Sequence, residues 1–104
     1  MRIKKGVCLL GLRPEIVIGL IVAQSVYRQH GANMVMTCGT DGKHSRGSLH
    51  YAGQAVDLRT RDIPRWKVEA IVHDLRESLN EEFDVVLESN HIHMEYQPKK
   101  GVNL

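Results

Sequence analysis

Histidine and acidic residues gather in two short stretches of the chain. Four of the six histidines lie within residues 43–57 and 88–95, and both stretches also carry carboxylates. Alternate side chains of a β-strand share a face, so His91 and His93 would project together while the apolar residues between and after them face the core. Two imidazoles held in this way can converge on one metal ion or one substrate atom.

A second pair of polar residues, His50 and Asp57, is separated by seven positions. This odd spacing would send the two side chains to opposite faces of an uninterrupted strand, so the chain must bend between them. Gly53 allows such a bend, and the small side chain of Ala55 lets a neighbouring group approach. Together with His93, the pair supplies two imidazoles and a carboxylate with a fourth position open, the arrangement expected of catalytic zinc.

A cysteine could fill the fourth position, which would make the site structural rather than catalytic. The chain has two cysteines, Cys8 and Cys38, and they are not at Cys-x-x-Cys spacing. We expect both to be small buried thiols without a disulfide. Cys38 remains a possible ligand because it directly precedes the loop that leads to His50.

Two ordered motifs carry a resemblance to a known family. The run SLHYAGQAVD at residues 48–57 resembles the Ser-x-His-x-x-Gly-x-Ala-x-Asp signature of the D-Ala-D-Ala carboxypeptidase family of zinc peptidases, and residues 91–93 resemble its later His-x-His element. That family includes vancomycin-resistance dipeptidases and L-alanyl-D-glutamate endopeptidases of phage lysins. Residues 41–57 are also similar to the hedgehog signalling domain, which shares the zinc site but has no established peptidase role. The resemblance covers residues 37–96.

The resemblance implies roles for individual residues. His50, Asp57 and His93 match the ligands of a bound Zn²⁺, and His91 matches a histidine that assists catalysis or holds the oxyanion. Relatives place an acidic residue directly before the His-x-His element, where this chain has Asn90. An amide cannot accept a proton from water at neutral pH, so another group must act as the base.

Glu88 is the candidate for this base. If Ser89 and Asn90 form a two-residue turn, Glu88 and His91 face each other across a hairpin on one side of the sheet. The family's arginine before the Ser-x-His element has no clear match, and His44 and Arg46 are its only substitutes.

The roles of other polar residues near these motifs can each be interpreted in two ways. Ser48 is expected to hydrogen-bond the loop or a ligand. Glu95 is expected to be solvated, with the orientation of His93 as the alternative. A basic stretch is expected to form a solvated edge, with contact to an acidic cell-wall polymer as the alternative. It comprises Arg59, Arg61 and Arg65.

The elements that must position these residues follow from periodicity and turn signals. Helices are predicted over residues 14–30 and from residues 62–64 to 79, and strands over residues 33–38, 55–58, 83–87 and 91–96. Residues 39–51 are predicted to form a loop and residues 99–104 a disordered tail. The pattern predicts a single α+β domain over residues 1–104, with a small, mostly antiparallel sheet and two helices, like the domains of the D-Ala-D-Ala peptidases and hedgehog.

The composition argues against some classes of function for this chain. The chain has 104 residues, a net charge of +2 and 25% charged residues, without a block of like charge that would indicate nucleic-acid binding. No apolar run approaches the ~20 residues of a membrane span, and no signal peptide is evident, so we expect a cytoplasmic protein that contacts no membrane. Its oligomeric state stays open.

The function predicted from these features is hydrolysis of peptide bonds in peptidoglycan stem peptides by a zinc metallopeptidase, as in phage-type lytic enzymes. Its partner would be the peptidoglycan substrate, which the protein would reach with the help of another protein. The alternative is a zinc-binding structural or interaction domain whose catalysis is impaired, as the hedgehog comparison and Asn90 both allow.

Overall fold

The computed structural model describes residues 1–41 and 48–98. It is an α+β fold with two helices and one five-stranded sheet, which confirms the predicted fold class. The elements in chain order are β1 (Arg2–Ile3), α1 (Pro14–Gln29), β2 (Val35–Cys38), β3 (Ala55–Arg59), α2 (Arg65–Ser78), β4 (Phe83–Leu87) and β5 (His91–Tyr96).

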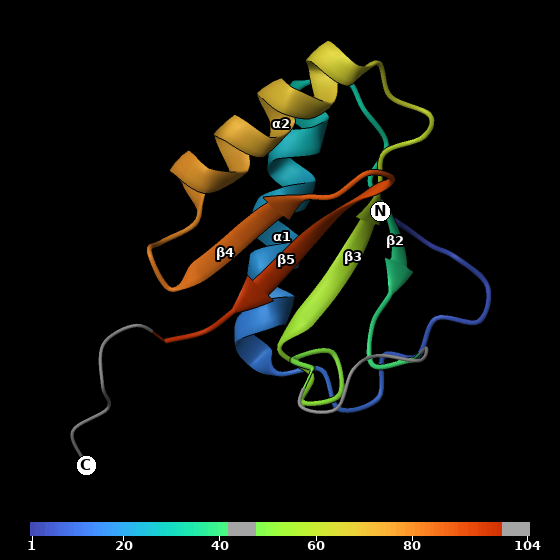
Figure 1. Ribbon diagram of the computed structural model, residues 1–104, viewed down its shortest axis with the longest axis vertical. Coiled ribbons are helices and arrows are strands. Elements are labelled where there is room, and N and C mark those ends of the chain that lie inside the picture. Colours follow the sequence, from blue (N-terminus) through green and yellow to red (C-terminus); the bar gives the residue numbers. More distant parts are fainter. Residues whose placement is uncertain (42–47, 99–104) are drawn as a thin grey trace.

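The strands are arranged in the order β1-β2-β3-β5-β4, so β3 and β5 are internal neighbours although a helix and β4 separate them in sequence (Figure 1). The β1–β2 pair is parallel, and the other three pairs are antiparallel. The sequence predicted the four longer strands. It did not predict β1, which has only two residues and no periodicity to detect.

Both helices pack against the same face of the sheet, where α1 crosses behind the strands beside α2 in Figure 1. The core between the layers contains Ile16, Leu20, Ala23, Val26, Tyr27, Val68, Ile71, Val72 and Leu75 from the helices, and Met36, Val56, Leu58, Val85, Ile92 and Met94 from the sheet. Burial of this apolar surface is the main force that holds the helices on the sheet.

The helix limits follow the signals in the sequence. Pro14 occupies the first turn of α1, where its missing N–H is not needed, and α2 begins directly after Pro64. Gly31 lies just beyond α1 with φ of +66°, a left-handed conformation that ends a helix. No helix among the described residues is both long and apolar enough to cross a membrane.

Strand alternation divides β3 and β5 between the core and the opposite face. Val56, Leu58, Ile92 and Met94 are fully buried towards the helices. The residues that alternate with them, including Asp57 and the two histidines of β5, therefore project from the other face of the sheet, which neither α1 nor α2 covers.

Candidate metal centre

The structure brings together the three side chains that the sequence predicted as metal ligands. Oδ1 of Asp57 lies 3.3 Å from Nε2 of His50 and 3.1 Å from Nδ1 of His93. The two imidazole rings are edge to face, with their centroids 5.0 Å apart. A single carboxylate oxygen therefore contacts one nitrogen of each ring.

The sheet itself sets two of these positions. Asp57 on β3 and His93 on β5 are paired residues of the antiparallel ladder, so the backbone register places their side chains next to each other on the same face. This contact joins residues 36 positions apart in the sequence. The alternation of apolar and polar residues in residues 91–96 predicted the face of His93, and the strand pairing adds Asp57 to it.

His50 reaches the same point from the loop before β3. Its side chain is almost fully buried, with 3% of the residue exposed. Its backbone N–H donates to Oγ of Ser48 at 3.2 Å, and its carbonyl accepts from the N–H of Gly53 at 3.0 Å. Gly53 has φ of +72°, so the predicted bend and the predicted loop role of Ser48 are both confirmed.

Each histidine is anchored through the nitrogen that does not face Asp57 in this cluster. Nδ1 of His50 lies 2.8 Å from the carbonyl oxygen of Gly39, and Nε2 of His93 lies 2.9 Å from Oε1 of Glu95. The expectation that Glu95 is solvated was wrong, because its side chain is only 20% exposed and contacts the ring of His93. Such contacts fix ring orientation, as the outer hydrogen bonds of metal-binding histidines do.

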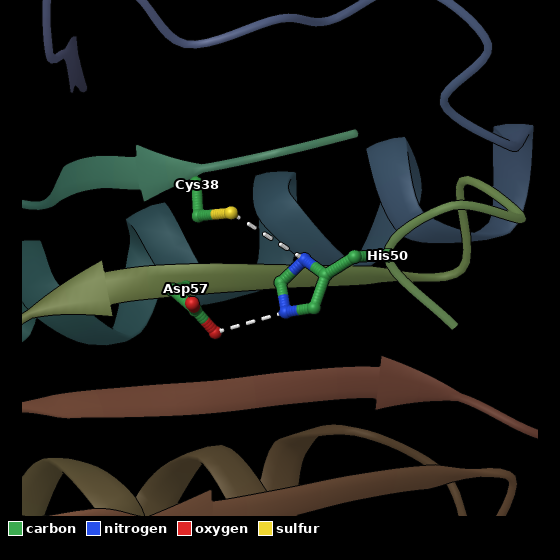
Figure 2. A group of neighbouring side chains, drawn as sticks. All are labelled: Cys38, His50 and Asp57. Atoms are coloured by element: carbon green, nitrogen blue, oxygen red, sulfur yellow. Dashed lines mark hydrogen bonds and ion pairs between the residues drawn. The ribbon is translucent and has the colours of Figure 1, made fainter. Parts of the chain in front are cut away.

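Cys38 also lies in the cluster, at the end of β2. Cys38, His50 and Asp57 form a group whose possible ligand atoms all lie within 4.8 Å of one another, close enough to hold a metal ion (Figure 2). Cys38 is the register partner of Asp57 across β2 and β3, although the register shifts between Met36 and Cys38. The sequence left Cys38 open as a ligand, and only this strand pairing places it beside the site.

Two donor sets can be compared: Cys38 with His50 and Asp57, or His50 with Asp57 and His93. Only the first has possible ligand atoms that all lie within 4.8 Å of one another among the described residues. Sγ of Cys38 lies 3.7 Å from Nδ1 of His50, the nitrogen that contacts Gly39, whereas Nε2 faces Asp57. Ligation through Cys38 and Nδ1 would break the contact with the Gly39 carbonyl. Ligation through Nε2, as the set of His50, Asp57 and His93 would require, keeps that contact.

The charges in the cluster stabilise one another. Burial raises the pKa of Asp57, but hydrogen bonds from His50 and His93 outweigh it and hold this pKa well below its usual range. The hydrogen bond to Asp57 raises the pKa of His93 against the effect of burial, with a further contribution from Glu95. Burial lowers the pKa of His50, yet its bonds to Asp57 and Gly39 raise it overall. Without a metal, the carboxylate thus favours protonated imidazoles.

The thiol of Cys38 is held in its neutral form. Burial raises its pKa to about 11, and the negative charges of Asp41 and Asp57 act in the same direction. Its sulfur lies 3.3 Å from the carbonyl oxygen of Asp41. Neither Cys8 nor Cys38 forms a disulfide in the part of the chain that the structure describes.

The two predicted catalytic residues lie at the turn between β4 and β5. Nε2 of His91 is 3.7 Å from Oδ1 of Asp57, and its Nδ1 is 2.7 Å from Oδ1 of Asn90. The N–H of Glu88 donates to the carbonyl of His91 at 2.9 Å, which closes the predicted tight hairpin. Neither turn residue has positive φ, so this turn differs from the usual mirror-image hairpin types.

Glu88 itself is exposed to solvent. Its carboxylate forms no hydrogen bond or ion pair with any side chain that the structure describes. Val86, two residues earlier, pairs with His93, so alternation places Glu88 on the face that carries the histidines. Glu88 thus shares a face of the sheet with the cluster, but its carboxylate does not contact the cluster. His44 and Arg46, the substitutes for the family's arginine, lie outside the described residues, as does the tail predicted to be disordered.

An N-terminal loop, residues 4–13, supports the loop that carries His50. The N–H of Cys8 donates to Oδ1 of Asp41 at 2.8 Å, and the N–H of Arg13 donates to the carbonyl of Gly53 at 2.9 Å. A Cβ added at Gly39 would lie 2.2 Å from the carbonyl oxygen of Cys8, and one at Gly53 would lie 1.9 Å from that of Gly11. Only glycine fits at these two close approaches.

No protein-family model matches this sequence, and a search of curated proteins finds no relative. The fold and the cluster together define a small α+β protein with a candidate metal centre on the open face of its sheet. The resemblance to D-Ala-D-Ala peptidases and hedgehog stays a prediction.

Proposed function

We propose that the protein is a zinc metallopeptidase that hydrolyses peptide bonds of peptidoglycan stem peptides, in the manner of phage-type lytic enzymes. The contact of one Asp57 oxygen with both His50 and His93 carries this proposal. It joins the two halves of the sequence motif at a single point. The peptidoglycan substrate comes from the sequence resemblance.

The donor set fits zinc. Two imidazole nitrogens and one carboxylate oxygen are the protein ligands of many catalytic zinc sites, and both rings carry the outer hydrogen bonds that such ligands need. A zinc ion held by His50, Asp57 and His93 would polarise a peptide carbonyl and lower the pKa of a water molecule. The same donors admit other divalent metals, so metal analysis belongs with any activity assay.

His91 is suited to stabilise negative charge on the substrate. A proton on Nδ1 satisfies the oxygen of Asn90, so Nε2 becomes a donor when the ring is an imidazolium. The carboxylate of Asp57 lies 3.7 Å from Nε2. The ring lies at the edge of the cluster, where its side chain is partly open to solvent. An oxyanion formed at this edge could accept a hydrogen bond from it.

Glu88 is proposed as the general base. Its carboxylate is exposed on the face of the sheet that carries the cluster, and no other described side chain competes for it. It can take a proton from water and return it to the leaving amine. Substrate binding would have to bring the reacting groups within its reach, because catalytic contacts often form only in the substrate complex.

The second candidate function is a zinc-binding structural or interaction domain without catalysis. The position of Asn90 favours it, because an amide stands where relatives have an acid and its oxygen already contacts His91. The Glu88 carboxylate forms no hydrogen bond or ion pair with a described histidine side chain, which points in the same direction. On this alternative, zinc would stabilise the fold and peptidoglycan would stay intact.

One assay separates the two functions. Zinc-loaded protein would be incubated with purified peptidoglycan, and newly released amino termini counted beside a Glu88→Ala variant. Glu77→Ala, on an exposed part of α2, is the matched control. The peptidase proposal expects release by the native protein and by Glu77→Ala, with a loss of about 100-fold or more in Glu88→Ala. If the native protein binds zinc but releases nothing, the structural domain is the better account.

A further inference from the structure

One edge of the sheet is left open on the side where the helices pack. Five strands span about 24 Å, whereas two packed helices cover only about 20 Å. Helix α2 packs over β4 at one edge and α1 lies beside it, so β1 at the opposite edge stays uncovered. Ile3 of β1 faces the helix side, because its parallel partner Met36 belongs to the core, yet Ile3 is 43% exposed.

An apolar patch lies at this open edge and on the outer side of α1. Its members are each between 43% and 67% exposed, and we call them the α1 patch: Met1, Ile3, Val17, Ile18 and Ile21. A groove of about 440 Å³ runs along α1 beside Met1, and its lining is mostly apolar. The first half of α1 is thus apolar on its outer side as well as on its core side, which is expected of a helix that something else covers.

The α1 patch lies in the basic part of the chain. Residues 1–40 contain five basic residues and one acidic residue, Glu15, whereas residues 41–104 contain nine basic and 11 acidic residues. Arg28 lines the groove and is the only charged residue in segment 16–29. The exposed side of α2, by contrast, carries Glu69 and Glu77. The charge around the patch is therefore complementary to an anionic partner.

A second copy of the chain or another protein fits the patch less well. Two copies that met through this face would bring like charges together, which opposes association. A stable protein interface takes about 20–30 residues from each side, whereas the patch and the groove together comprise only nine residues. A lipid surface has no fixed shape to match and accepts a small patch that inserts only partly.

We propose that the α1 patch attaches the protein to the surface of a membrane that contains anionic lipids. Val17, Ile18 and Ile21 enter the boundary between headgroups and acyl chains, and Arg28 contacts lipid phosphates. The lack of a spanning segment led to the expectation that the chain contacts no membrane, but attachment to a membrane surface requires no span.

The proposed attachment is compatible with an accessible metal centre. The helices lie on one face of the sheet and the cluster of Asp57, His50 and His93 on the other, so a membrane bound at α1 leaves the cluster in solvent (Figure 1). Membrane binding should therefore need neither the metal nor the peptidase activity.

Sedimentation with lipid vesicles tests this proposal. One set of vesicles consists of phosphatidylcholine alone, and in the other about a third of the lipid is phosphatidylglycerol, which is anionic. We expect the protein to bind the anionic vesicles at least about tenfold more tightly than the neutral ones, and to bind more weakly as salt is raised. Affinity should be the same with zinc and with a chelator. Vesicle binding that persists while peptidoglycan stays uncut would contradict the peptidase proposal alone.

Variants assign the binding to the patch. The double variant Ile18→Ser and Ile21→Ser should lower affinity for anionic vesicles at least about tenfold, because it removes the inserted apolar surface. Arg28→Gln should lower it about fivefold. Val86→Ser removes an exposed apolar side chain on β4, and Arg65→Gln removes an exposed charge on α2, so both are matched controls and should bind like the native protein. Circular dichroism would confirm that each variant folds.

A second measurement needs no variant. Vesicles with a spin-labelled lipid should broaden the amide signals of α1 in ¹⁵N-labelled protein more than those of β4. The proposal is overturned if both sets of vesicles bind equally, if the double variant binds like the native protein, or if neither set binds. In the last case, a native dimer that the double variant cannot form would make the patch an interface between copies, and a native monomer would leave an acidic protein as its partner.

Discussion

Asp57 on β3 and His93 on β5 are direct partners in the sheet, and Oδ1 of the first lies 3.1 Å from Nδ1 of the second. The backbone ladder therefore assembles half of the candidate metal centre before any metal is bound. Glu95, also on β5, contacts the other nitrogen of His93 and holds the ring in place. A site built on paired central strands is more rigid than one built on loops alone.

Replacing Asp57 should strongly weaken metal binding. We expect Asp57→Ala to lower zinc affinity at least about 100-fold, because it removes a ligand and the charge that both rings contact. Calorimetric titration of metal-free protein would measure this, with folding checked by circular dichroism. Glu77→Ala serves again as the control. A folded Asp57→Ala variant that retains native zinc affinity would place the metal elsewhere.

Glu95 should act on the metal through His93. The Glu95→Gln variant keeps an acceptor oxygen but loses the charge, and we expect zinc affinity to fall about tenfold, the lower end of the effect of such partners. Competition with a chelating dye measures this difference, and Glu95→Ala should fall further. If neither variant differs from the native protein, the contact of Glu95 with His93 has no bearing on the metal.

The thiol of Cys38 should stay out of the metal's coordination sphere. Its sulfur approaches His50 on the side of Nδ1, which Gly39 already contacts, whereas the proposed metal would bind Nε2. Cobalt-loaded protein should therefore lack the near-ultraviolet band of sulfur-to-cobalt charge transfer. The prediction fails if that band appears in the native and Cys8→Ser proteins and disappears in Cys38→Ser.

Stability should depend on pH in opposite ways with and without zinc. In the metal-free protein the raised pKa values of His50 and His93 mean that folding binds protons, so stability falls as pH rises through these values. The lowered pKa of Asp57 adds stability that is lost only below its unfolded pKa, near about pH 4. Zinc instead requires neutral imidazoles, so its stabilising effect should grow as pH rises.

Urea unfolding between about pH 5.5 and about pH 8, with either zinc or a chelator, would measure both trends. In Asp57→Asn the chelator curve should become flatter and the zinc effect should be lost. A zinc effect that is the same at both ends of this range would contradict ligation by the two histidines.

Gly53 should tolerate no side chain. We expect Gly53→Ala to destabilise the protein by at least about 3 kcal/mol, because a Cβ would overlap the carbonyl of Gly11 in addition to straining a positive φ. Gly31→Ala is the matched control, since Gly31 has a similar φ of +66° but an open environment. The Gly31→Ala substitution should lower the free energy of unfolding by only about 1 kcal/mol. Equal losses in the two variants would mean that the contact with Gly11 is unimportant.

Periodicity in the sequence predicted much of the fold and part of the site. The alternation within β5 was enough to place His91 and His93 on one face, and the bend at Gly53 followed from the odd spacing of His50 and Asp57. These are local properties, and local geometry determines them. The same reasoning gave the hairpin that ends at Glu88 and His91.

The features that sequence reasoning missed depend on tertiary contacts. Cys38 joins the cluster because β2 pairs with β3 after a shift in register, which no local pattern indicates. Glu95 is held by His93 although a carboxylate at that position of a strand is usually solvated. The support from Cys8 and Gly11 joins segments about 30 to 40 residues apart, so only the folded chain shows it.

The alternation of β5 links the cluster to the hydrophobic core through a single register. If β5 slipped by one residue against β3, Ile92 and Met94 would turn to water and the histidines would turn towards the helices. A misaligned strand would thus lose core packing and ligand geometry together. A chain that buries Ile92 and Met94 in this register therefore also presents His91 and His93 on the face that carries the cluster.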